Sequence, residues 1–388
     1  MGLDLDDTKK AIVIVDNAII VPPPRGMGGN NNRFQSSGVL TAEGEMVENS
    51  ITWGEGRQVN LAPEMPDPAS IEHLPGQHMF GGMLFGHFGH FLVESTTRLW
   101  ALDELRPAIQ SIVYTPKINA RPMQFVRQFR PLFNVLGATV PVRSTPVPLR
   151  VDRLFVPRQG FGQFELMRGS EAFRSYMRRF AGRTVPAKGA EKIYISRSGL
   201  ARDRGGIIGE WLLEEQLKAE GFEIYHPQNH PLLDQVAQYK AAKMIVACDC
   251  SPLHLVGFVG NAEQKVAIIK RRSMDLIPHF VDQLRLFQNI DAFEVDVLVE
   301  DWLPYPDKRP GRRSCGEISF ARLGAALAEK GMISGHLPWR DISDAEREDE
   351  RERLRVLHDG TPFFRMLNRE KYLAGQQEGT VRGDNKFA

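Results

Sequence analysis

Cysteine, net charge and long apolar runs are all scarce in this chain of 388 residues. The three cysteines, Cys248, Cys250 and Cys315, are too few and too badly spaced for a disulfide framework or a four-ligand zinc site, so a reducing compartment fits best. The formal net charge is +1, which gives no general attraction to nucleic acid or to acidic membranes. Any anion-binding site must therefore be local.

The apolar run at residues 11–22 is too short to cross a bilayer, since a spanning helix needs roughly 20 apolar residues. It also contains Asp16 and is expected to be a strand. Residues 1–10 are acidic and polar and lack the features of a signal peptide. No transmembrane segment is therefore expected.

Segments typical of strands and helices alternate along much of the chain. A helix is expected over residues 89–105, followed by a strand at 111–114, a helix at 122–136 and a strand at 154–157. The alternation is clearest from 190 to 272, where it includes a helix expected at 210–220 and predicts a parallel sheet with right-handed crossovers. Two such stretches in sequence indicate two Rossmann-like domains that face a cleft.

The length allows this division, because domains usually contain about 100–200 residues. Hydrophobic residues make up 42% of the chain and charged residues 25%, which is typical of globular proteins. The fold is therefore expected to be α/β, with a β-rich N-terminal segment and a C-terminal helical extension that ends in a disordered tail. The expected boundaries are residues 1–75, 76–185 and 186–275 for the N-terminal segment and the two domains, and 276–388 for the extension.

A strand that runs into a cationic loop is the most informative segment of the sequence. Residues 192–206 read KIYISRSGLARDRGG, in which Arg197, Arg202 and Arg204 follow the expected strand. Glycines let a backbone come close to a ligand, and guanidinium groups match phosphate oxygens. The carboxyl end of a parallel strand is where α/β folds bind anionic ligands. The alternative interpretation is an ordinary solvated loop.

A second segment carries polar side chains at helical spacing. His87, His90, Glu94 and Arg98 would share one face of the expected helix, beside an apolar face that should meet the core. A neutral imidazole can accept a proton from a hydroxyl group near neutral pH, and Glu94 could orient His90 or bind a substrate hydroxyl. The alternative is a structural network in which His90 bonds to Glu94 and Glu94 pairs with Arg98.

The same segment allows a metal site as a rival interpretation. His87, His90 and Glu94 could be three ligands of a catalytic zinc ion. The sequence is not HExxH, however, and no carboxylate that could serve as a general base lies between the two histidines.

A turn of small residues follows the strand expected at 243–247 and opens a short helix. Ser251 suits the N-cap of that helix, and its N–H groups can hold a phosphate. Asp249, Cys250 and Ser251 are therefore candidate phosphate-binding residues. His254 could reach the same ligand, with a packed core histidine as the alternative.

With these segments in place, roughly residues 80–270 resemble glycosyltransferase family 61. The family has a His-x-x-x-Glu helix followed by an arginine, to which His90, Glu94 and Arg98 are similar. Its members also have a strand that ends in Ser-Arg, a second arginine and a glutamate that opens a helix. The corresponding residues here are Ser196, Arg197, Arg204 (or Arg202) and Glu210.

A third part of the resemblance is a Gly-Phe strand, a helix with a glutamine and a turn of small residues. Gly221-Phe222, Gln235 and the turn that starts at Cys248 look similar. Many members read Gly-x-His-Gly-Ala in this turn, whereas Asp249 stands at the histidine position here. The asparagine usual before the helix glutamate is replaced by Gly209.

The resemblance implies a GT-B arrangement, in which the C-terminal domain binds a nucleotide-sugar donor and the N-terminal domain binds a saccharide acceptor. It also implies inversion at the anomeric carbon, no tightly bound cofactor and no metal, with a UDP-sugar as the favoured donor. Protein cations and helix N-termini would then stabilise the departing diphosphate. The acceptor would be an oligosaccharide or a lipid-linked glycan, and no nucleic-acid partner is expected.

The expected activity is therefore inverting, metal-independent glycosyl transfer in bacterial surface-polysaccharide (capsule) biosynthesis. The expected location is the cytoplasm, with peripheral association at the inner membrane. The expected catalytic residues are His90 as general base, Glu94 as its orienter and His87 as reserve base. The expected donor-binding residues are Arg197, Arg202, Arg204, Glu210, Asp249, Cys250, Ser251 and His254, and Arg98 is expected to support the acceptor side.

Two other classes of protein remain as alternatives. One is a non-catalytic subunit that binds a nucleotide or a glycan. The other is a metal-dependent hydrolase that uses His87, His90 and Glu94. A dinucleotide oxidoreductase is disfavoured because no G-x-G-x-x-G follows a strand.

Overall fold

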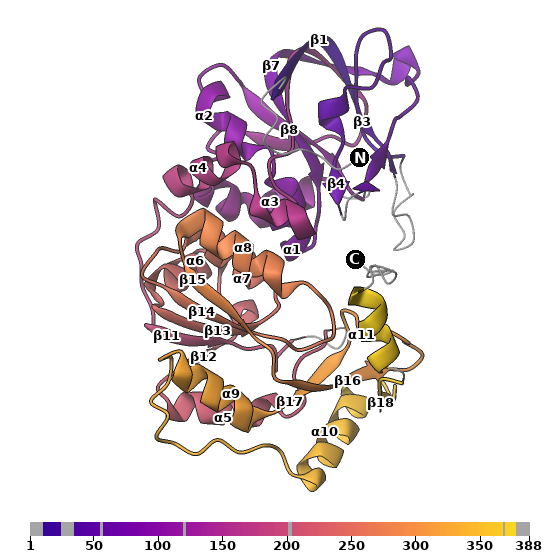
Figure 1. Cartoon of the computed structure of the whole chain (residues 1–388). Helices are drawn as coiled ribbons and strands as arrows, with labels where there is room; N and C mark the ends of the chain where they lie inside the picture. The colour runs from indigo at the N-terminus through magenta and orange to yellow at the C-terminus, as the bar shows by residue number, and fades with distance from the viewer. Residues whose placement is uncertain are drawn as a thin grey trace. The chain divides into compact units, whose positions relative to one another are not determined.

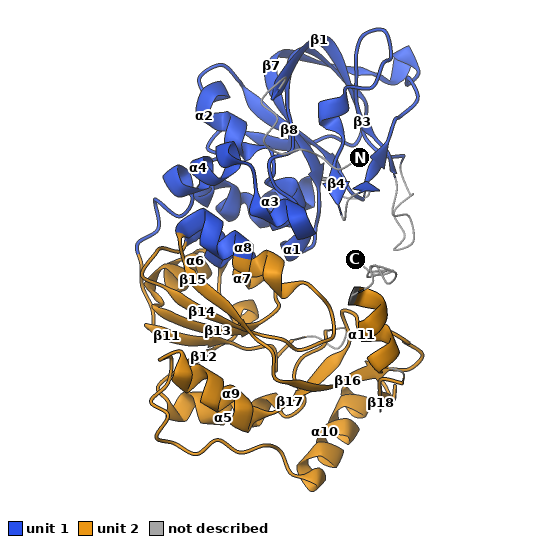
Figure 2. Ribbon diagram, in the orientation of Figure 1, with its two compact units in different colours: residues 1–186, 254–259, 282–288 blue, residues 187–253, 260–281, 289–388 orange. Residues whose placement is uncertain are grey.

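The computed structural model describes residues 11–24, 35–54, 57–118, 122–200, 204–367 and 369–377. The chain divides into two compact units, shown in different colours in Figure 2. Unit 1 contains residues 1–186, 254–259 and 282–288, and unit 2 contains residues 187–253, 260–281 and 289–388. Each unit is therefore built from segments that are not contiguous in the sequence.

Unit 1 is organised around a six-stranded sheet with the order β3-β1-β10-β7-β8-β9 (Figure 1). Its strands are β1 (Ile12–Val21), β3 (Gly38–Leu40), β7 (Glu72–Leu84), β8 (Ser111–Pro116), β9 (Val142–Ser144) and β10 (Leu149–Pro157). Strands β10, β7, β8 and β9 run parallel, whereas β1 is antiparallel to both β10 and β3. The N-terminal strands β1 and β3 thus extend the same sheet as the parallel strands.

Short strands and helices complete unit 1. The short strands are β2 (Gln35–Ser36), β4 (Trp53–Gly54), β5 (Arg57–Gln58) and β6 (Asn60–Leu61). The helices are α1 (Phe88–His90), α2 (Leu102–Leu105), α3 (Pro122–Val135) and α4 (Glu171–Phe180), together with parts of α7 (Pro252–Val259) and α8 (Ile277–Gln288). The α7 and α8 segments join this unit through an aromatic cluster: Phe258 and Phe287 lie with their ring centroids 5.4 Å from that of Phe161, which itself stacks on Phe173 at 5.0 Å.

Strand β7 was not expected from the sequence, because its segment contains Pro75 and three glycines that interrupt an apolar pattern. Gly82 lies at φ +97°, and a Cβ atom there would come within 2.4 Å of the Arg98 guanidinium. The backbone therefore needs glycine at this position both for its conformation and for the close approach of a buried side chain. The register of the β7–β8 pairing shifts between Phe80 and Gly82.

The single helix expected over residues 89–105 is wrong as a continuous element. After α1 the chain forms a π-helical turn, η3 (Phe91–Ser95), then a 3-10 turn, η4 (Leu99–Ala101), and finally α2. The hydroxyl groups of Thr96 and Thr97 bond to the carbonyls of Leu92 and Glu94, which competes with the regular helical hydrogen bonds. Such π-helical turns occur frequently at functional sites.

Unit 2 contains a five-stranded parallel sheet with the order β12-β11-β13-β14-β15. The strands are β11 (Lys192–Ile195), β12 (Glu223–Tyr225), β13 (Met244–Cys248), β14 (Lys265–Ile269) and β15 (Asp291–Val295). Helices α5 (Glu210–Ala219) and α9 (Phe320–Glu329) cover one face of this sheet and α6 (Leu232–Ala241) the other (Figure 1). A core of buried apolar side chains from α5, α9 and the strands fills the first of these interfaces.

The C-terminal region was expected to be helical. It contains the expected helices but also three strands. A three-stranded sheet has the order β17-β16-β18, with β16 (Leu298–Pro304), β17 (Cys315–Ile318) and β18 (Phe363–Arg365). It is accompanied by α10 (Asp344–Leu357) and α11 (Arg369–Gln377). The tail that was expected to be disordered begins at the end of α11, and residues 378–388 lie outside the described part of the chain.

The α/β class and the alternation of parallel strands with helices over residues 190–272 are confirmed by these elements. None of the helices in the described ranges is long and apolar enough to cross a membrane.

Candidate functional site

The carboxyl ends of three adjacent parallel strands in unit 1 carry polar side chains. The segment of His90 and Glu94 follows β7, Lys117 follows β8 directly, and Gln163 lies in the loop after β10. Strand β7 precedes both β8 and β10 in the chain and lies between them in the sheet, so the connections lead away from it in opposite directions. Such topological switch points are where open α/β sheets bind ligands.

His90 and Glu94 form a close pair at this edge. The Nδ1 atom of His90 lies 2.5 Å from Oε2 of Glu94, and the Glu94 side chain is only 4% exposed whereas that of His90 is 21% exposed. A carboxylate beside Nδ1 favours the tautomer in which Nδ1–H donates to it. The lone pair of Nε2 is then available to accept a proton, which is the arrangement that a general base needs.

Three further side chains border the His90 ring. The Nε2 atom of Gln163 lies 3.1 Å from Nδ1 of His90, and the Phe85 ring stacks on the imidazole at 5.5 Å. The Lys117 ammonium lies 5.8 Å from the centre of the Phe85 ring. Burial lowers the pKa of Lys117, and the negative charge of Glu94 opposes that shift. This cation lies beside the pair at the end of β8.

The expected polar face of four residues forms only in part. His87 is exposed, with its ring centroid 5.3 Å from that of His90, whereas Arg98 is fully buried. Arg98 donates to the backbone carbonyls of Pro157, Asn49 and Ile51 at 2.7–3.0 Å. The π-helical turn separates Arg98 from Glu94 on the helix surface. The expected structural network is therefore correct for His90 and Glu94 but not for an ion pair between Glu94 and Arg98.

His254 lies in the part of α7 that belongs to unit 1. Its Nδ1 atom is 2.8 Å from Oε1 of Gln283, and the residue is 5% exposed. Burial lowers the pKa of His254 to about 4, the hydrogen bond to Gln283 opposes this, and positive charge on His90 lowers it slightly more. His254 is therefore neutral at pH 7.

This buried histidine predicts a pH dependence of folding stability. The folded-state pKa of His254 is about 4 and the unfolded value about 6.5, so the unfolded chain binds a proton more readily between these values. Stability is complete above pH 6.5 and falls as the pH drops toward 4, with a loss of about 2 kcal/mol between pH 7 and pH 5. Urea unfolding at the two pH values measures this loss.

The His254→Gln variant, which cannot take up a proton, is the matched comparison for that measurement. Its unfolding free energy should change by about 2 kcal/mol less than that of the wild type over the same pH interval. An identical pH dependence in both proteins would contradict the assignment.

Unit 2 also has its candidate ligand-binding residues at the carboxyl ends of adjacent parallel strands. Arg197 follows β11, Asp249 follows β13, and Arg271 and Arg272 follow β14. Strand β11 comes first in the chain and lies between β12 and β13, so a topological switch point falls between β11 and β13. The expected anion-binding loop and the turn of small residues therefore meet at neighbouring strand ends.

Glu210 braces the loop that carries Arg197. Its Oε1 atom accepts hydrogen bonds from the Tyr194 hydroxyl at 2.8 Å and from the Arg197 backbone N–H at 2.7 Å, and the residue is 2% exposed. Burial raises the pKa of Glu210, which the bonds from Arg197 and Tyr194 oppose. Gly209 before it lies at φ +70°, a left-handed conformation that asparagine tolerates better than most residues. That conformation explains why glycine can stand where family members have asparagine.

The Arg197 side chain is held at the mouth of this loop. Its Nε donates to the carbonyl of Gly205 at 2.8 Å. A Cβ atom at Gly205 would lie 1.9 Å from the Ser314 carbonyl oxygen, so this glycine allows a close approach of the protein's own backbone. Arg204 belongs to the same loop and is partly buried, whereas Arg202 lies outside the described residues.

Asp249 lies between two arginines that the sequence analysis did not include. Arg272 donates to its Oδ2 at 2.6 and 2.9 Å, and Nη2 of Arg271 donates to the same oxygen at 3.3 Å, while Nε of Arg271 lies 2.8 Å from Oδ1. Burial would raise the pKa of Asp249, but the charges of Arg271, Arg272 and Arg197 hold it below its usual value. Asp249 thus stands among three guanidinium groups, and with Glu210 beside Arg197 the strand ends carry three cations against two carboxyl groups.

The remaining residues of the turn are small and largely buried. Ser251 directly precedes α7, which begins at Pro252. Burial raises the pKa of Cys250 to about 12 and that of Cys248 well above its usual value, so both are protonated thiols at neutral pH. Neither cysteine is therefore a reactive nucleophile in this state.

The residues that sequence reasoning missed had a usable signal in one case. Arg271 and Arg272 directly follow a strand that the pattern predicted, so their place at the ligand-binding edge could have been deduced. Lys117 directly follows β8, which ends at Pro116, but the strand expected at 111–114 stopped short of it and so did not mark this residue. Gln163 had no such signal, because it lies six residues beyond β10 in an irregular loop.

Among the residues with described positions, no group of three or more His, Cys, Asp or Glu side chains is placed to hold a metal ion.

The chain was compared with protein families and with curated proteins. The model of the family described as Glycosyltransferase 61 matches residues 88–269, a stretch that contains the His90–Glu94 pair, the Arg197 loop and Asp249. The comparison with curated proteins found no match.

Proposed function

From the premise that this chain is a glycosyltransferase of family 61, we propose that it moves a sugar from a nucleotide-sugar donor to a saccharide acceptor with inversion at the anomeric carbon. The observation that carries the proposal is the cluster of Arg197, Arg271 and Arg272 at adjacent strand ends of a parallel sheet. Guanidinium groups held at such an edge suit the diphosphate of a nucleotide sugar.

The proposed chemistry is a single displacement. Nε2 of His90 takes the proton of an acceptor hydroxyl as that oxygen attacks the anomeric carbon, and the bond from this carbon to the diphosphate breaks. Glu94 holds the imidazole in the required tautomer and stabilises the imidazolium that forms. The electron pair of the broken bond stays on the diphosphate, whose charge the arginines balance. The proton on His90 then passes to solvent.

The roles of the other expected residues follow their positions. Glu210 and Tyr194 set the course of the Arg197 loop, so we propose a positioning role for Glu210. Arg98 ties the segment after β7 to the backbone at Asn49 and Ile51 and supports the His90 side of the sheet. His87 remains the proposed reserve base, because its ring contacts that of His90.

The proposal includes a GT-B arrangement, no requirement for a bound metal, and a role in bacterial surface-polysaccharide biosynthesis at the cytoplasmic side of the membrane. It rests on the family for these points. The favoured donor is a UDP-sugar. The acceptor is an oligosaccharide or a lipid-linked glycan.

A thermal-shift panel tests the donor site. UDP, GDP, CMP and dTDP and their sugars are added to the full chain with and without EDTA. A ligand at 100 times its Kd stabilises a protein by about 2.7 kcal/mol, which raises Tm measurably. One nucleotide family is expected to give such a rise in Tm in the presence of chelator. The Arg272→Gln variant should lose most of the shift, because it removes a charge-assisted contact at the strand end.

The matched control is Arg322→Gln, which changes an exposed arginine of α9 in the same unit and should keep the full shift. A shift with no transfer to any acceptor would favour the non-catalytic subunit. A loss of stability in EDTA, without a shift for any nucleotide, would favour the metal-dependent hydrolase and contradict the proposal.

A further inference from the structure

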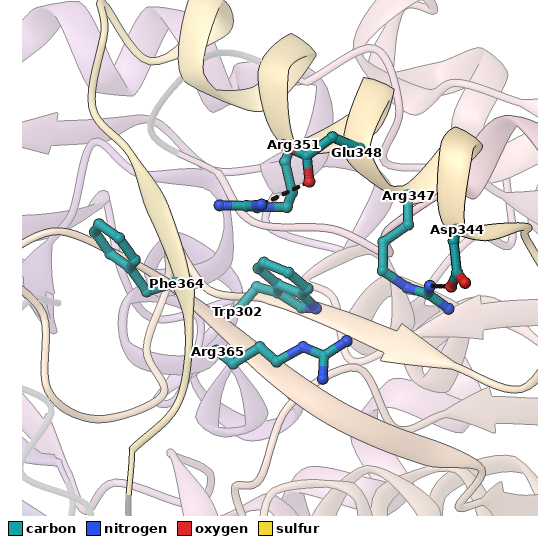
Figure 3. Close-up of a pocket in the computed structure, with 7 residues that line it drawn as sticks. All are labelled: Trp302, Asp344, Arg347, Glu348, Arg351, Phe364 and Arg365. Atoms are coloured by element: carbon teal, nitrogen blue, oxygen red, sulfur yellow. Dashed lines mark hydrogen bonds and ion pairs between the residues drawn. The ribbon is translucent and has the colours of Figure 1, made fainter.

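A separate hollow in unit 2 lies between helix α10 and strands β16 and β18. Its volume is about 400 Å³. Figure 3 shows the side chains that line it: Trp302, Asp344, Arg347, Glu348, Arg351, Phe364 and Arg365. None of these residues belongs to the arginine cluster at the strand ends or to the stretch that matches the family.

The centre of the hollow is an indole flanked by two cations. The guanidinium of Arg351 lies 5.3 Å from the Trp302 ring centre and that of Arg365 lies 5.4 Å from it. In Figure 3 the two guanidinium groups lie on opposite sides of the indole. Cation–π contacts of this kind hold the guanidinium groups in place and leave N–H groups at their edges available to donate hydrogen bonds to a ligand.

The charges of the hollow are compensated except at one position. Arg347 pairs with Asp344 and, at 2.8 Å, with Glu317, and Arg351 pairs with Glu348 at 2.6 Å. Arg365 is exposed and has no carboxylate partner within the described ranges of the chain. The hollow therefore offers one uncompensated guanidinium, that of Arg365, while Arg351 on the other side of the indole is engaged by Glu348.

An apolar surface borders this cation. Phe364 is 50% exposed, although its neighbour Phe363 is buried, and it lines the hollow together with Arg365. An exposed aromatic ring offers an apolar surface against which the C–H face of a ligand can pack.

We propose that this hollow binds a carboxylate-bearing sugar, such as a uronic acid unit of the acceptor or product polysaccharide. The sugar carboxylate would accept hydrogen bonds from the N–H groups of Arg365, and the pyranose ring would lie on Phe364. Glu348 and Asp344 would accept hydrogen bonds from sugar hydroxyls. The saccharide identity rests on the proposed function, whereas the binding chemistry rests on the hollow alone.

The same side chains disfavour a phosphate group as the occupant. A phosphate carries nearly two negative charges at neutral pH, whereas only Arg365 is without a carboxylate partner. The carboxylates of Asp344 and Glu348 in the wall would repel the second charge. A monoanion with hydroxyl groups satisfies both the cation and these acceptors.

The test is a saturation-transfer NMR titration of the full chain with methyl β-D-glucuronide and methyl β-D-glucoside, which differ only in the carboxylate. The glucuronide should bind at millimolar concentration and the glucoside at least about tenfold more weakly. Arg365→Gln should weaken glucuronide binding by about tenfold, and Phe364→Ala by several-fold. Both variants should keep the thermal shift produced by the donor nucleotide.

The control is Arg355→Gln on the same helix, whose guanidinium is paired with Glu352 outside the hollow and whose loss should leave glucuronide binding unchanged. Equal binding of the two glycosides would overturn the proposal, as would unchanged glucuronide binding in both Arg365→Gln and Phe364→Ala. Displacement of the glucuronide by an equal concentration of inorganic phosphate would show a general anion site and would also overturn it. The donor shift, measured in the same samples, reports separately on the proposed function.

Discussion

Replacing His90 by alanine should lower kcat by about 10²–10⁴-fold while the Kd for the donor nucleotide stays within a few-fold of the wild-type value. The reason is that Nε2 of His90 is the proposed proton acceptor. The Glu94 carboxylate, 2.5 Å from Nδ1, keeps the proton of the neutral ring on Nδ1 and leaves Nε2 unprotonated. The proposed donor-binding residues Arg197, Arg271 and Arg272 do not include the imidazole. Initial rates at saturating donor and acceptor measure kcat, and the thermal shift measures donor binding.

The matched control is His73→Ala. His73 lies at the N-terminal end of β7, whereas His90 follows the carboxyl end of the same strand. The His73 side chain pairs with Asp152 at 2.7 Å. That exposed pair is expected to contribute less than about 1 kcal/mol to stability, and its loss should leave kcat within a few-fold of the wild type. If His90→Ala retained turnover within a few-fold as well, His90 would not be the base.

Glu94→Gln offers a graded comparison within the same pair. A glutamine keeps the volume and can still accept a hydrogen bond from Nδ1, but it no longer stabilises the imidazolium that forms during transfer. Its effect on kcat should therefore be smaller than that of His90→Ala and should be accompanied by unchanged donor binding.

Replacing Asp249 by asparagine is expected to reduce the unfolding free energy by about 3–5 kcal/mol, since the loss of one partner from a buried ion pair leaves buried charge uncompensated. The side chains concerned are nearly inaccessible: Asp249 is 4% exposed and Arg271 is 3% exposed. The two guanidinium groups would then lie together without a counter-ion, and burial with the charge of Arg272 already lowers the pKa of Arg271 to about 10. Urea unfolding, followed by a probe of unit 2, measures the loss.

Asp296→Asn is the control for this effect. Asp296 pairs with Lys270 at 2.8 Å, but its side chain is 51% exposed, so the expected loss is below about 1 kcal/mol. Inorganic pyrophosphate should raise Tm more in Asp249→Asn than in the wild type, because an anion can replace the missing carboxylate between the arginines. A loss below 1 kcal/mol, or an equal pyrophosphate effect in both proteins, would contradict the role assigned to Asp249.

Asp249 also shows how a departure from the family pattern can be understood structurally. The carboxylate stands where many members have a histidine, and two arginines from the end of β14 surround it. With three guanidinium groups against the carboxyl groups of Asp249 and Glu210, cations remain in excess for the proposed diphosphate. The aspartate at the histidine position is therefore explained by its ion pairs with Arg271 and Arg272.

Much of the secondary structure was predictable because short-range features mark where each helix or strand begins and ends. In unit 2 the expected helix at 210–220 and strand at 243–247 agree with α5 and β13 to within one residue at each end. Glycine at position 221 ends the first of these, and β-branched and apolar residues mark the second. Strand β7 and the π-helical turn escaped this reasoning. Glycines interrupt the first pattern, and hydroxyl groups of Thr96 and Thr97 divert hydrogen bonds in the second.

The candidate site was predictable in its types of residue but not in their partners. The i,i+4 spacing of His90 and Glu94 predicted their contact, and the strand-to-loop transition at Ser196 predicted the position of Arg197. Nothing local could assign Gln163 to His90, since the two residues are 73 positions apart in the chain. Arg98 shows the opposite error: its spacing indicated an ion pair with Glu94, but its guanidinium is buried among backbone carbonyls.

The sequence by itself determined the class of the fold, the alternation of strands and helices in unit 2, and the residue types that suit glycosyl transfer. These depend on periodicity and on neighbours within a turn of helix or a strand end. Only the tertiary structure decided that Asp249 lies between Arg271 and Arg272, that Arg98 is a buried brace, and that α10 and β18 enclose a hollow around Trp302. Such contacts join residues far apart in the chain, and strand order and burial, rather than local pattern, bring them together.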